Sequence, residues 1–488
     1  MSRPRGSRRI ALSGIILAGV LIFSCHPERN FIEDSNAKLS FTLDTLYFDT
    51  VFTTLSTVTK SFRIKNPHNQ FIQIEEVSLA GGASSVFRIN VDGTPGTEFH
   101  HLEIAPKDSM YVFVEATLAP NQSNEILRIQ DSILFFTNGN LQDIDLVAWG
   151  QDVHLLRDSV IEDHVTWEAD KPYLIVGYAY VDSTASLSIE QGARIHLHRD
   201  ALLYVDGRLE VTGTVDEPVR FMGDRLEEFY EDIPGQWGFI YLSENSSGNR
   251  IDYAEIVNGT MGILISAPPE SGNQPDLEIS NTFIHRMSSN GIYALNASVT
   301  ATNVVIGDCG GSCTGLVYGG AYEFTHCTLN NNWPGYFSNR QLPALLLTDY
   351  FGTYDEEGNL LVYTGGVFEK AGFFNSVIYG NDRMELVLDS YDDRQLVYRF
   401  DHCLTRIDED SLDYQTDPLF TSIINNENPM LDSLFMPDSL SPVIDEGLSD
   451  YAILLPLDRN GNSRLDDAAP DLGAYEWIGS AVADQGKR

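Results

Sequence analysis

One short stretch of the sequence, residues 223–242, carries the residue types that acid–base catalysis needs. Five carboxylates lie within nine positions beside three aromatic residues: Asp224, Glu227, Glu228, Glu231 and Asp232, with Phe229, Tyr230 and Trp237. Two carboxyl groups about 5 Å or about 9 Å apart form the catalytic pair of glycoside hydrolases. A loop between strands is also rich in acidic residues, because it must remain in water. The stretch therefore has a catalytic and a structural interpretation.

A second stretch, residues 333–366, is rich in aromatic residues that could bind a sugar. The candidate ligand-binding residues are Trp333, Tyr336, Tyr350 and Tyr354. Aromatic faces stack on the C–H surface of sugar rings, and nearby polar side chains bond the hydroxyl groups. The alternative is a packing cluster, because "PALLL" in the same stretch must be buried. Packing is the favoured interpretation, and it predicts that Trp333 is more buried than Tyr350 or Tyr354.

The histidine and cysteine residues do not predict a metal site. His326-Cys327 and His402-Cys403 are neighbours in strands, so the two side chains of each pair point in opposite directions. That geometry is poor for a shared tetrahedral zinc ion. The segment "DRNGNSRLDD" at 458–467 resembles a calcium loop but lacks its glycine at the sixth position and its final glutamate. No metal and no cofactor are expected.

Two further pairs leave alternatives open. Arg250 and Arg286 are candidate bases for a polysaccharide lyase, but an arginine on an acidic surface more often forms a salt bridge. Cys309 and Cys313 flank Gly-Gly-Ser and could close a small disulfide in an oxidising compartment. They could equally be small buried thiols.

Composition limits the partners. The 488 residues are 43% hydrophobic and carry a net charge of −39, so the chain folds but repels polyanions. Nucleic acid binding depends on Lys and Arg that neutralise phosphates, and no basic surface is predicted beyond the N-terminus.

The N-terminus predicts export. Arg3, Arg5, Arg8 and Arg9 precede an apolar run at 10–23, which is too short to span a bilayer with ease. The segment that ends in "LIFSC" resembles a bacterial lipoprotein signal, with Cys25 as the lipidated residue, although Phe23 departs from the usual small residue. The resemblance implies an exported protein anchored by lipid to the outer membrane. An uncleaved anchor is the alternative.

The elements that must position these residues are short strands. Residues 39–150 alternate apolar and polar residues between turns, which predicts a β-sandwich. "FRIKNP", "IQIEEV" and "IAPKDSMYVFVEATLAP" resemble immunoglobulin-like domains of the ASH/Hydin type, which serve as spacers or adhesion modules. From Ser186 the strands shorten to two or three inward positions each, as in "LSIEQGARIHLHRDALLYVDGRLEVTG". Such strands stack on equivalent strands one turn away in a parallel β-helix.

An internal repeat supports the β-helix. Six segments share one frame, centred on Tyr253, Asn281, Asn303, His326, Asn375 and His402. Their spacings of 28, 22, 23, 49 and 27 residues are one-turn lengths, apart from the 49, which predicts an inserted loop at 333–366. Large residues two positions before each centre and small ones directly after it predict stacked columns, and the asparagines predict a partial ladder.

The C-terminal motifs complete the assignment. "DPLF", "SPVIDEG", "LPLDRNGNSR" and "PDLGAYEW" resemble the closing segment of right-handed parallel β-helix proteins of the pectin-lyase-like superfamily. The predicted fold is all-β, with an N-terminal β-sandwich followed by a right-handed parallel β-helix. The predicted divisions are a signal peptide at 1–25, a linker at 26–38, the sandwich at 39–150, the helix at 151–415, the closing segment at 416–478 and a tail at 479–488.

The predicted function is non-catalytic binding of a glycan or another surface polymer by a cell-envelope lipoprotein. The alternative is a polysaccharide lyase or glycoside hydrolase acting on the flank of the helix. The carboxylate stretch lies outside the stacked strands, so a structural role for its acids is favoured. The superfamily includes enzymes and proteins without a known reaction, so the fold alone does not decide.

Overall fold

The computed structural model describes residues 29–53, 57–120, 126–268, 274–335, 337, 339–354, 358–391, 396–466 and 468–479. Cys25 and Tyr336 lie outside the described residues, and so does the side chain of Tyr354. Across these ranges, no helix is both long enough and apolar enough to cross a membrane.

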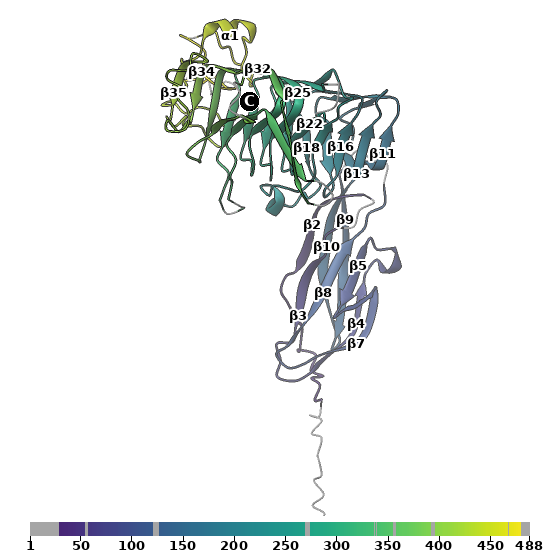
Figure 1. Ribbon diagram of the computed structural model, residues 1–488. Coiled ribbons are helices and arrows are strands. Elements are labelled where there is room, and N and C mark those ends of the chain that lie inside the picture. Colours follow the sequence, from purple (N-terminus) through teal and green to yellow (C-terminus); the bar gives the residue numbers. More distant parts are fainter. Residues whose placement is uncertain are drawn as a thin grey trace, which may run out of the picture. The chain divides into compact units, whose positions relative to one another are not determined.

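The chain divides into two compact units. The first comprises Met1–Tyr47, Thr57–Ala116 and Gln130–Val147, and the second comprises Phe48–Ser56, Thr117–Ile129 and Ala148–Arg488. Both are built almost entirely from strands (Figure 1).

The N-terminal strands form two five-stranded sheets among the described residues, in the orders β1-β3-β8-β5-β6 and β2-β10-β9-β4-β7. Their bounds are β1 Ser40–Phe41, β2 Thr45–Phe52, β3 Lys60–Lys65, β4 Ile72–Leu79, β5 Phe87–Val91, β6 Thr94–Gly96, β7 Glu98–Ile104, β8 Ser109–Ala116, β9 Leu127–Thr137 and β10 Asn140–Gln151, with a short 3-10 helix η1 at Gly82–Ser84. Alternating side chains of β8 are buried, as the period of two in its sequence predicts. Phe135 of one sheet contacts Phe41 and Phe62 of the other, so the two sheets share a core.

The second unit contains 23 strands joined by parallel pairing in the described part of the chain. They are β11 His154–Ile161, β12 His164–Trp167, β13 Tyr173–Val181, β14 Ser186–Glu190, β15 Arg194–Leu197, β16 Leu202–Val205, β17 Arg208–Thr212, β18 Val219–Gly223, β19 Ile240–Leu242, β20 Asn249–Asp252, β21 Ala254–Val257, β22 Ile263–Ser266, β23 Asp276–Ser280, β24 Phe283–His285, β25 Ile292–Thr302, β26 Val305–Gly307, β27 Thr314–Thr325, β28 Thr328–Asn331, β29 Leu345–Thr348, β32 Val367–Gly380, β33 Leu386–Asp389, β34 Arg399–Thr405 and β35 Phe420–Asn425. A separate hairpin pairs β30 Tyr350–Tyr354 with β31 Leu360–Thr364, and a 3-10 helix η2 spans Glu228–Tyr230.

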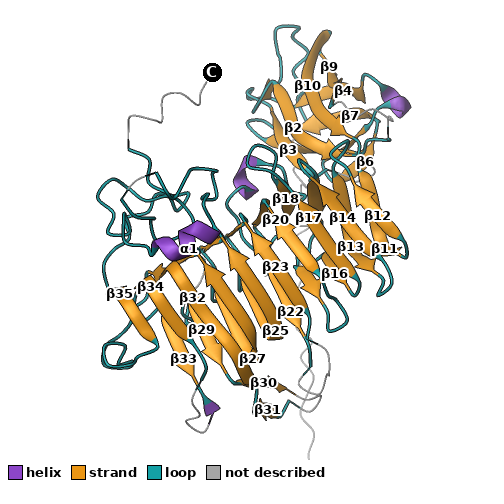
Figure 2. Cartoon of the chain, turned by 90° about the horizontal axis from the view of Figure 1, so that it is seen from above, coloured by secondary structure: helices purple, strands orange, loops and turns teal. Residues whose placement is uncertain are grey.

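Each strand pairs with the strand one turn away, so the chain winds through three sheets (Figure 2). Sheet 1 includes β16, β19, β22, β29 and β33; sheet 2 includes β14, β17, β20 and β23; sheet 3 includes β15, β18, β21, β24, β26 and β28. Longer strands such as β25 and β32 continue from one sheet into the next. One strand from each sheet makes one rung of the helix. The predicted fold class is confirmed.

The interior is built from columns of equivalent residues. Ile279 of β23 pairs in register with Ala301 of β25, and that column continues through Phe324, Phe373 and Phe400. The rings of Phe373 and Phe400 stack with centroids 4.9 Å apart, close to the spacing of neighbouring strands. All of these side chains are fully buried. Large residues recur at this position because each one packs on its own counterpart in the next rung.

The six repeat centres are corner residues between sheets 2 and 3. Each has a positive φ, from 45° at Asn375 to 54° at Asn303 and His326. Asn and His are among the non-glycine residues that tolerate this left-handed conformation best. The Asn303 amide donates to Asn281 Oδ1 (3.0 Å), which confirms the predicted partial ladder. The repeat in the sequence therefore marks the tightest bend of each rung.

The 49-residue spacing is not one inserted loop, and that prediction was wrong. β29 lies within the stretch and pairs with β27 and β33 in sheet 1. The extra residues form two separate excursions, 332–344 before β29 and 349–366 after it. Ala344, Leu345 and Leu347 are fully buried, as "PALLL" predicts. A full rung strand was hidden between the two excursions.

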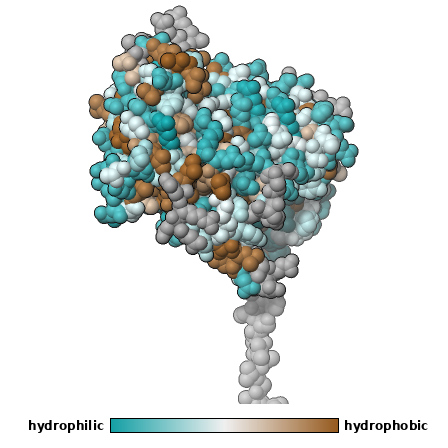
Figure 3. All heavy atoms as spheres, turned by 45° about the horizontal axis from the view of Figure 1, so that its top comes forward, coloured by the Kyte–Doolittle hydropathy of each residue, from teal (hydrophilic) through white to brown (hydrophobic). Residues whose placement is uncertain are grey.

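Within the predicted closing segment, 416–478, β35 pairs with β34 as a further strand of the helix, and residues 426–478 pack on the outer face of sheet 3. Phe435 and Tyr475 form a cluster with Val305, and Val443 and Leu472 form another with Val377 and Leu404. Its helix α1 spans Ser449–Leu454, with Ile453 and Leu454 largely exposed. Figure 3 shows hydrophobic residues gathered at the top of the view, the end where Figure 1 places α1.

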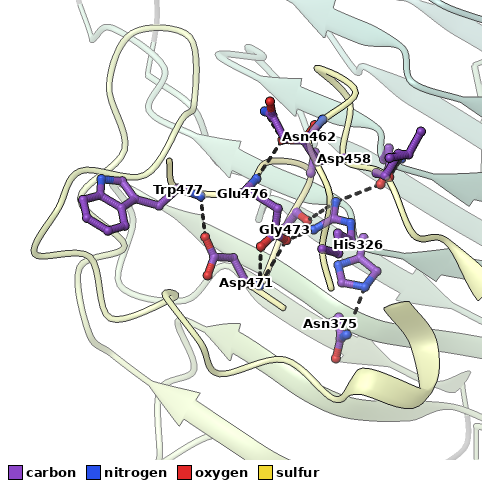
Figure 4. A network of polar contacts seen from close by, with 12 residues as sticks. His326, Asn375, Asp458, Asn462, Asp471, Gly473, Glu476 and Trp477 are labelled. Carbon is purple, nitrogen blue, oxygen red and sulfur yellow. Dashed lines mark hydrogen bonds and ion pairs between the residues drawn. The ribbon is translucent and has the colours of Figure 1, made fainter. Parts of the chain in front are cut away.

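A buried polar network joins the closing segment to the corner residues (Figure 4). Arg464 is fully buried, forms an ion pair with Glu476 and donates to Asn303 Oδ1 (2.9 Å). The Asp458 carboxylate accepts the backbone N–H groups of Asn462 (2.7 Å) and Glu476 (2.9 Å). The motif that resembles a calcium loop thus uses Asp458 to organise its own turn. The four cysteines among the described residues are buried free thiols.

Candidate functional site

Two adjoining cavities lie over the outer face of sheet 3. Their volumes are about 630 and 680 Å³, and both are lined by Phe283, Arg286 and Leu434. The two cavities therefore lie next to each other on either side of these three residues, and we name them together the sheet 3 groove. The carboxylate stretch and the closing segment border the first cavity, and Trp333 lines the second.

The repeat frame explains why Phe283 occupies the centre of the groove. Asn281 is the corner residue of its rung, and Thr282 directly after it points inward and is fully buried. Alternation in β24 then directs Phe283 and His285 outward. The Phe283 ring contacts both His285 (centroids 5.2 Å apart) and Phe435 of the closing segment (5.9 Å).

The carboxylate stretch is an ordered excursion between β18 and β19. Gln236 stabilises the excursion. The Gln236 side-chain amide donates hydrogen bonds to the carbonyl oxygens of Tyr230 (2.6 Å) and Ile233 (2.7 Å). Trp237 returns the chain to the interior, where it is fully buried and donates to the carbonyl oxygen of Val257 (2.8 Å). Gly235 makes the return possible with φ of 78°.

Three of the five predicted carboxylates have cationic or imidazole partners. Asp224 accepts a bond from the His198 ring (2.6 Å), and Asp232 pairs with Arg286. Glu227 accepts two bonds from Arg225, at 2.9 and 3.1 Å. The remaining two, Glu228 and Glu231, are exposed and line the first cavity, whereas Asp224 lines neither cavity.

Arg225 links an acid to an aromatic ring. Its guanidinium lies 3.8 Å from the centroid of Tyr230, in cation–π contact, while it binds Glu227. The hydrogen bond with Glu227 raises the pKa of Arg225 above its ordinary value. The pair fixes the Tyr230 ring as part of the wall of the first cavity.

The second cavity contains a histidine–aspartate pair that the sequence did not predict. His285 Nε2 lies 2.8 Å from Asp308 Oδ2, and both residues line this cavity with Asp232 and Arg286. Asp308 has φ of 49° and follows β26 directly. A histidine held by a carboxylate can transfer protons when a substrate reaches its other ring nitrogen.

The closing segment supplies the opposite wall. Arg459 lies over the rings of Phe283 (5.5 Å) and Tyr475 (5.9 Å) and donates to the Tyr475 hydroxyl (3.1 Å). Burial is the largest cause of the raised pKa of Tyr475. This wall comes from residues that are more than 170 positions away from Phe283 in the sequence, so no local pattern could have placed it there.

The described aromatic candidates lie in two different places, with Trp333 before β29 and Tyr350 after it. Trp333 is 3% exposed, whereas Tyr350 is half-buried and donates to Asp389 Oδ2 (2.5 Å) at the other end of β29. Trp333 is thus more buried than Tyr350, as expected. Tyr354 belongs to β30, but its side chain and all of Tyr336 lie outside the described residues. The structure brings Trp333 next to the carboxylate stretch and leaves Tyr350 out of both cavities.

The groove holds no cluster of three metal-ligating side chains within the described ranges. Among the described residues, the one cluster of this kind consists of Glu76, Glu98 and His100, and it lies on the surface of the sandwich. Arg250 and Arg286, the candidate lyase bases, each have a carboxylate partner, Asp252 and Asp232 respectively. The salt-bridge interpretation of both arginines is confirmed.

Comparisons with known proteins leave the family open. No family model matches the chain, and no curated protein matches it in sequence. A family 123 glycoside hydrolase from Clostridium perfringens, studied for glycolipid glycan hydrolysis, is 11% identical over 25% of this chain and 26% of its own, with a TM-score of 0.18. The catalytic domain of a family 87 α-1,3-glucanase, solved with tetrasaccharides, is 12% identical over 78% of this chain and 90% of its own, with a TM-score of 0.17. The present chain spans about a quarter of the first protein. Neither likeness identifies an activity, so membership of the pectin-lyase-like superfamily stays a prediction.

Proposed function

We propose that the sheet 3 groove binds a neutral glycan chain without cleaving it. The observation that carries this proposal is that the two cavities lie side by side and share Phe283, Arg286 and Leu434 in their lining. Each cavity, at about 630 and 680 Å³, is of the size that takes a small organic ligand. Two such cavities next to each other suit neighbouring units of one sugar chain.

The lining suits a sugar. Tyr230 and Phe283 are half-buried and provide aromatic surface in the groove, and the almost fully buried rings of Trp333 and Tyr475 pack behind it. Polar side chains, among them the exposed Asn460, line the first cavity and can bond hydroxyl groups. Alternation of aromatic and polar groups is the recognition pattern for the two kinds of surface on a pyranose ring.

The charges favour a neutral ligand and binding over catalysis. Arg220, Arg225 and Arg286 are each paired with an acid inside the groove: Glu255, Glu227 and Asp232. These arginines are therefore already neutralised, and the net charge of −39 repels a polyanion at longer range. The same ion pairs occupy Glu227 and Asp232, so of the five predicted carboxylates Glu228 and Glu231 are the two that line the groove outside these ion pairs.

The test is a titration of the purified protein by calorimetry with neutral β-1,4-glucan, β-1,3-glucan and β-1,4-mannan hexasaccharides. Tyr230→Ala should weaken binding of the best ligand by about 1–3 kcal/mol, because it removes an aromatic wall. Phe229→Ala is the matched control, because Phe229 is on the same loop, is 75% exposed and lines neither cavity. Equal losses in the two variants would place the ligand elsewhere.

One observation favours a second candidate, a hydrolase or lyase in the second cavity. His285 with Asp308 is a possible proton-transfer pair beside Arg286. Incubation of the same hexasaccharides, and of trigalacturonate, followed by mass spectrometry of products would test this function. Turnover that is lost in His285→Gln would replace the binding proposal, and intact ligands would support it.

We propose in addition that the protein is exported and held on the outer membrane by lipid at Cys25, with the sandwich as a spacer. The support is the N-terminal sequence alone. Membrane fractionation of Cys25→Ser should show release into the soluble fraction. Membrane association that survives the substitution would contradict a lipid anchor.

A further inference from the structure

Two paired strands of the sandwich bring two glutamates and a histidine together on one outer face. β4 and β7 pair antiparallel, with Glu76 directly opposite His100, and Glu98 lies two positions before His100. Val77 and Phe99, which alternate with these residues, are buried and face the core. Alternation along each strand therefore turns Glu76, Glu98 and His100 outward. The sequence did not predict this set, because its members belong to two strands that only the fold pairs.

The three side chains are close enough to share one ion. His100 Nε2 lies 2.9 Å from Glu98 Oε1. One possible ligand atom from each of Glu76, Glu98 and His100 lies within 4.8 Å of the other two. Ligands held about 2.0–2.1 Å from a tetrahedral zinc ion are about 3.3 Å from one another. Small rotations of the side chains reach that geometry while the two strands keep their pairing.

The charges of the set call for a cation. Neither Glu76 nor Glu98 forms an ion pair with a lysine or arginine in the part of the chain that the structure describes. Glu103, near the other end of β7, is by contrast paired with Arg29. Two neighbouring carboxylates repel each other when both are ionised, and a divalent cation between them replaces the repulsion by attraction.

The mixture of ligands selects the kind of ion. Ca²⁺ and Mg²⁺ prefer oxygen ligands alone, whereas an imidazole nitrogen suits Zn²⁺ and related transition metals. Zinc bound by three protein ligands keeps its fourth position for water or a further ligand. Ser78 Oγ donates to Glu76 Oε1 (2.9 Å), and a hydrogen bond of this kind orients a coordinating carboxylate.

We propose that Glu76, Glu98 and His100 bind one Zn²⁺ ion through two carboxylates and one imidazole. Because Glu76 belongs to β4 and the other two ligands belong to β7, the ion cross-links the two strands. β7 is the outermost strand of its sheet and pairs on one side only, with β4. The ion therefore stabilises an edge of the sandwich that opens more easily than its core. This site is independent of the sheet 3 groove and of the ligand that the groove takes.

Calorimetric titration of the purified protein, after treatment with a chelator and its removal, tests the site. Zn²⁺ should bind at one site per chain, and Mg²⁺ at the same concentration should not displace it. His100→Gln and Glu76→Gln should each weaken Zn²⁺ binding by about a hundredfold, because each substitution removes a ligand. His101→Gln is the matched control, since His101 is the next residue, is also exposed and lies outside the set. Absence of Zn²⁺ binding, or equal affinity of the wild type and His100→Gln, would overturn the proposal.

A local measurement shows whether the ion joins the two strands. Amide hydrogen exchange of β7 is compared with and without Zn²⁺ under native conditions. Zn²⁺ should increase the protection of β7 in the wild type and in His101→Gln, and it should leave the protection unchanged in His100→Gln. Unchanged protection in the wild type, or an equal increase in His100→Gln, would refute the cross-link between β4 and β7.

Discussion

Arg464 offers the sharpest test of what holds the closing segment on the helix. Its side chain has no exposed surface, and it is ion-paired with Glu476, which is 3% exposed. Arg464→Met keeps the length and apolar stem but removes the charge. Glu476 then remains buried without its cation, and Asn303 Oδ1 loses the donor at 2.9 Å. Removing one member of a buried ion pair costs about 3–5 kcal/mol.

That cost applies to detachment of the closing segment, because the rungs beneath keep their own pairing. At about 1.4 kcal/mol per tenfold change, the segment should open some two to three and a half orders of magnitude more often. Amide hydrogen exchange of residues 440–478 under native conditions measures this opening directly. Arg199→Met is the control, because the Arg199 side chain is 85% exposed and should change nothing.

The pH dependence provides a second check. Burial, the largest cause, raises the pKa of Glu476 to about 7 from an ordinary 4.5. The folded state therefore binds the proton more strongly between pH 4.5 and 7, and stability from this group falls as pH rises through that window. The loss in Arg464→Met should be larger at pH 8, where Glu476 is ionised, than at pH 5.5. Exchange that is unchanged within tenfold at pH 8 would refute the reasoning, and so would failure of the Arg464→Met, Glu476→Leu double variant to recover protection.

Three further outcomes are expected. Trp333→Ala should destabilise the protein by about 3–5 kcal/mol, seen as a fall in Tm of several degrees, because the ring is 3% exposed; an unchanged Tm would mean that the ring supports little. Burial lowers the pKa of His196 to about 4 from 6.5, so acidification from pH 7 to 5 should cost about 2 kcal/mol as the unfolded chain takes up the proton. Urea unfolding at both pH values should show that His196→Gln lacks this loss, because glutamine can still donate to the Gly223 carbonyl; an equal loss would assign it to other groups. If any glycan is cleaved, Glu227→Gln should retain most of the rate, since Arg225 occupies that carboxylate, and a hundredfold loss with the fold intact would reverse this assignment.

The fold was predictable because every rung of the β-helix has the same pattern of buried positions and corner residues. Inward positions such as Leu187 and Ile189 show their period of two in the sequence, and both are buried. The corner residues stand out because five of the six are asparagine or histidine, which accept a positive φ more readily than most other residues. The insertion at 333–366 was misread because β29 has only four residues, too few for a periodic signal beside long excursions.

The groove was only partly predictable. The carboxylate stretch and Trp333 were identified as separate candidates, and nothing local showed that both border one surface. His285 carried a usable signal, since positions two and four after a corner residue point outward and His285 is the fourth after Asn281. Arg459 and Tyr475 carried no usable signal in the sequence, because their position depends on how the closing segment folds back over sheet 3.

The corners of the rungs also decide where the chain can vary in length. From β20 onward one or two residues make the connection between sheets 2 and 3, as Tyr253 does between β20 and β21 and residues 281–282 do between β23 and β24. The strands on either side stack in register on those of the next rung. An added residue there would shift every column that follows. Between sheets 3 and 1 the connections range from the four-residue turn before β16 to the sixteen-residue excursion at 224–239 before β19. Foreign segments grafted for new binding specificities should therefore be accepted along the edge between sheets 3 and 1, and rejected at the short corners between sheets 2 and 3 from β20 onward.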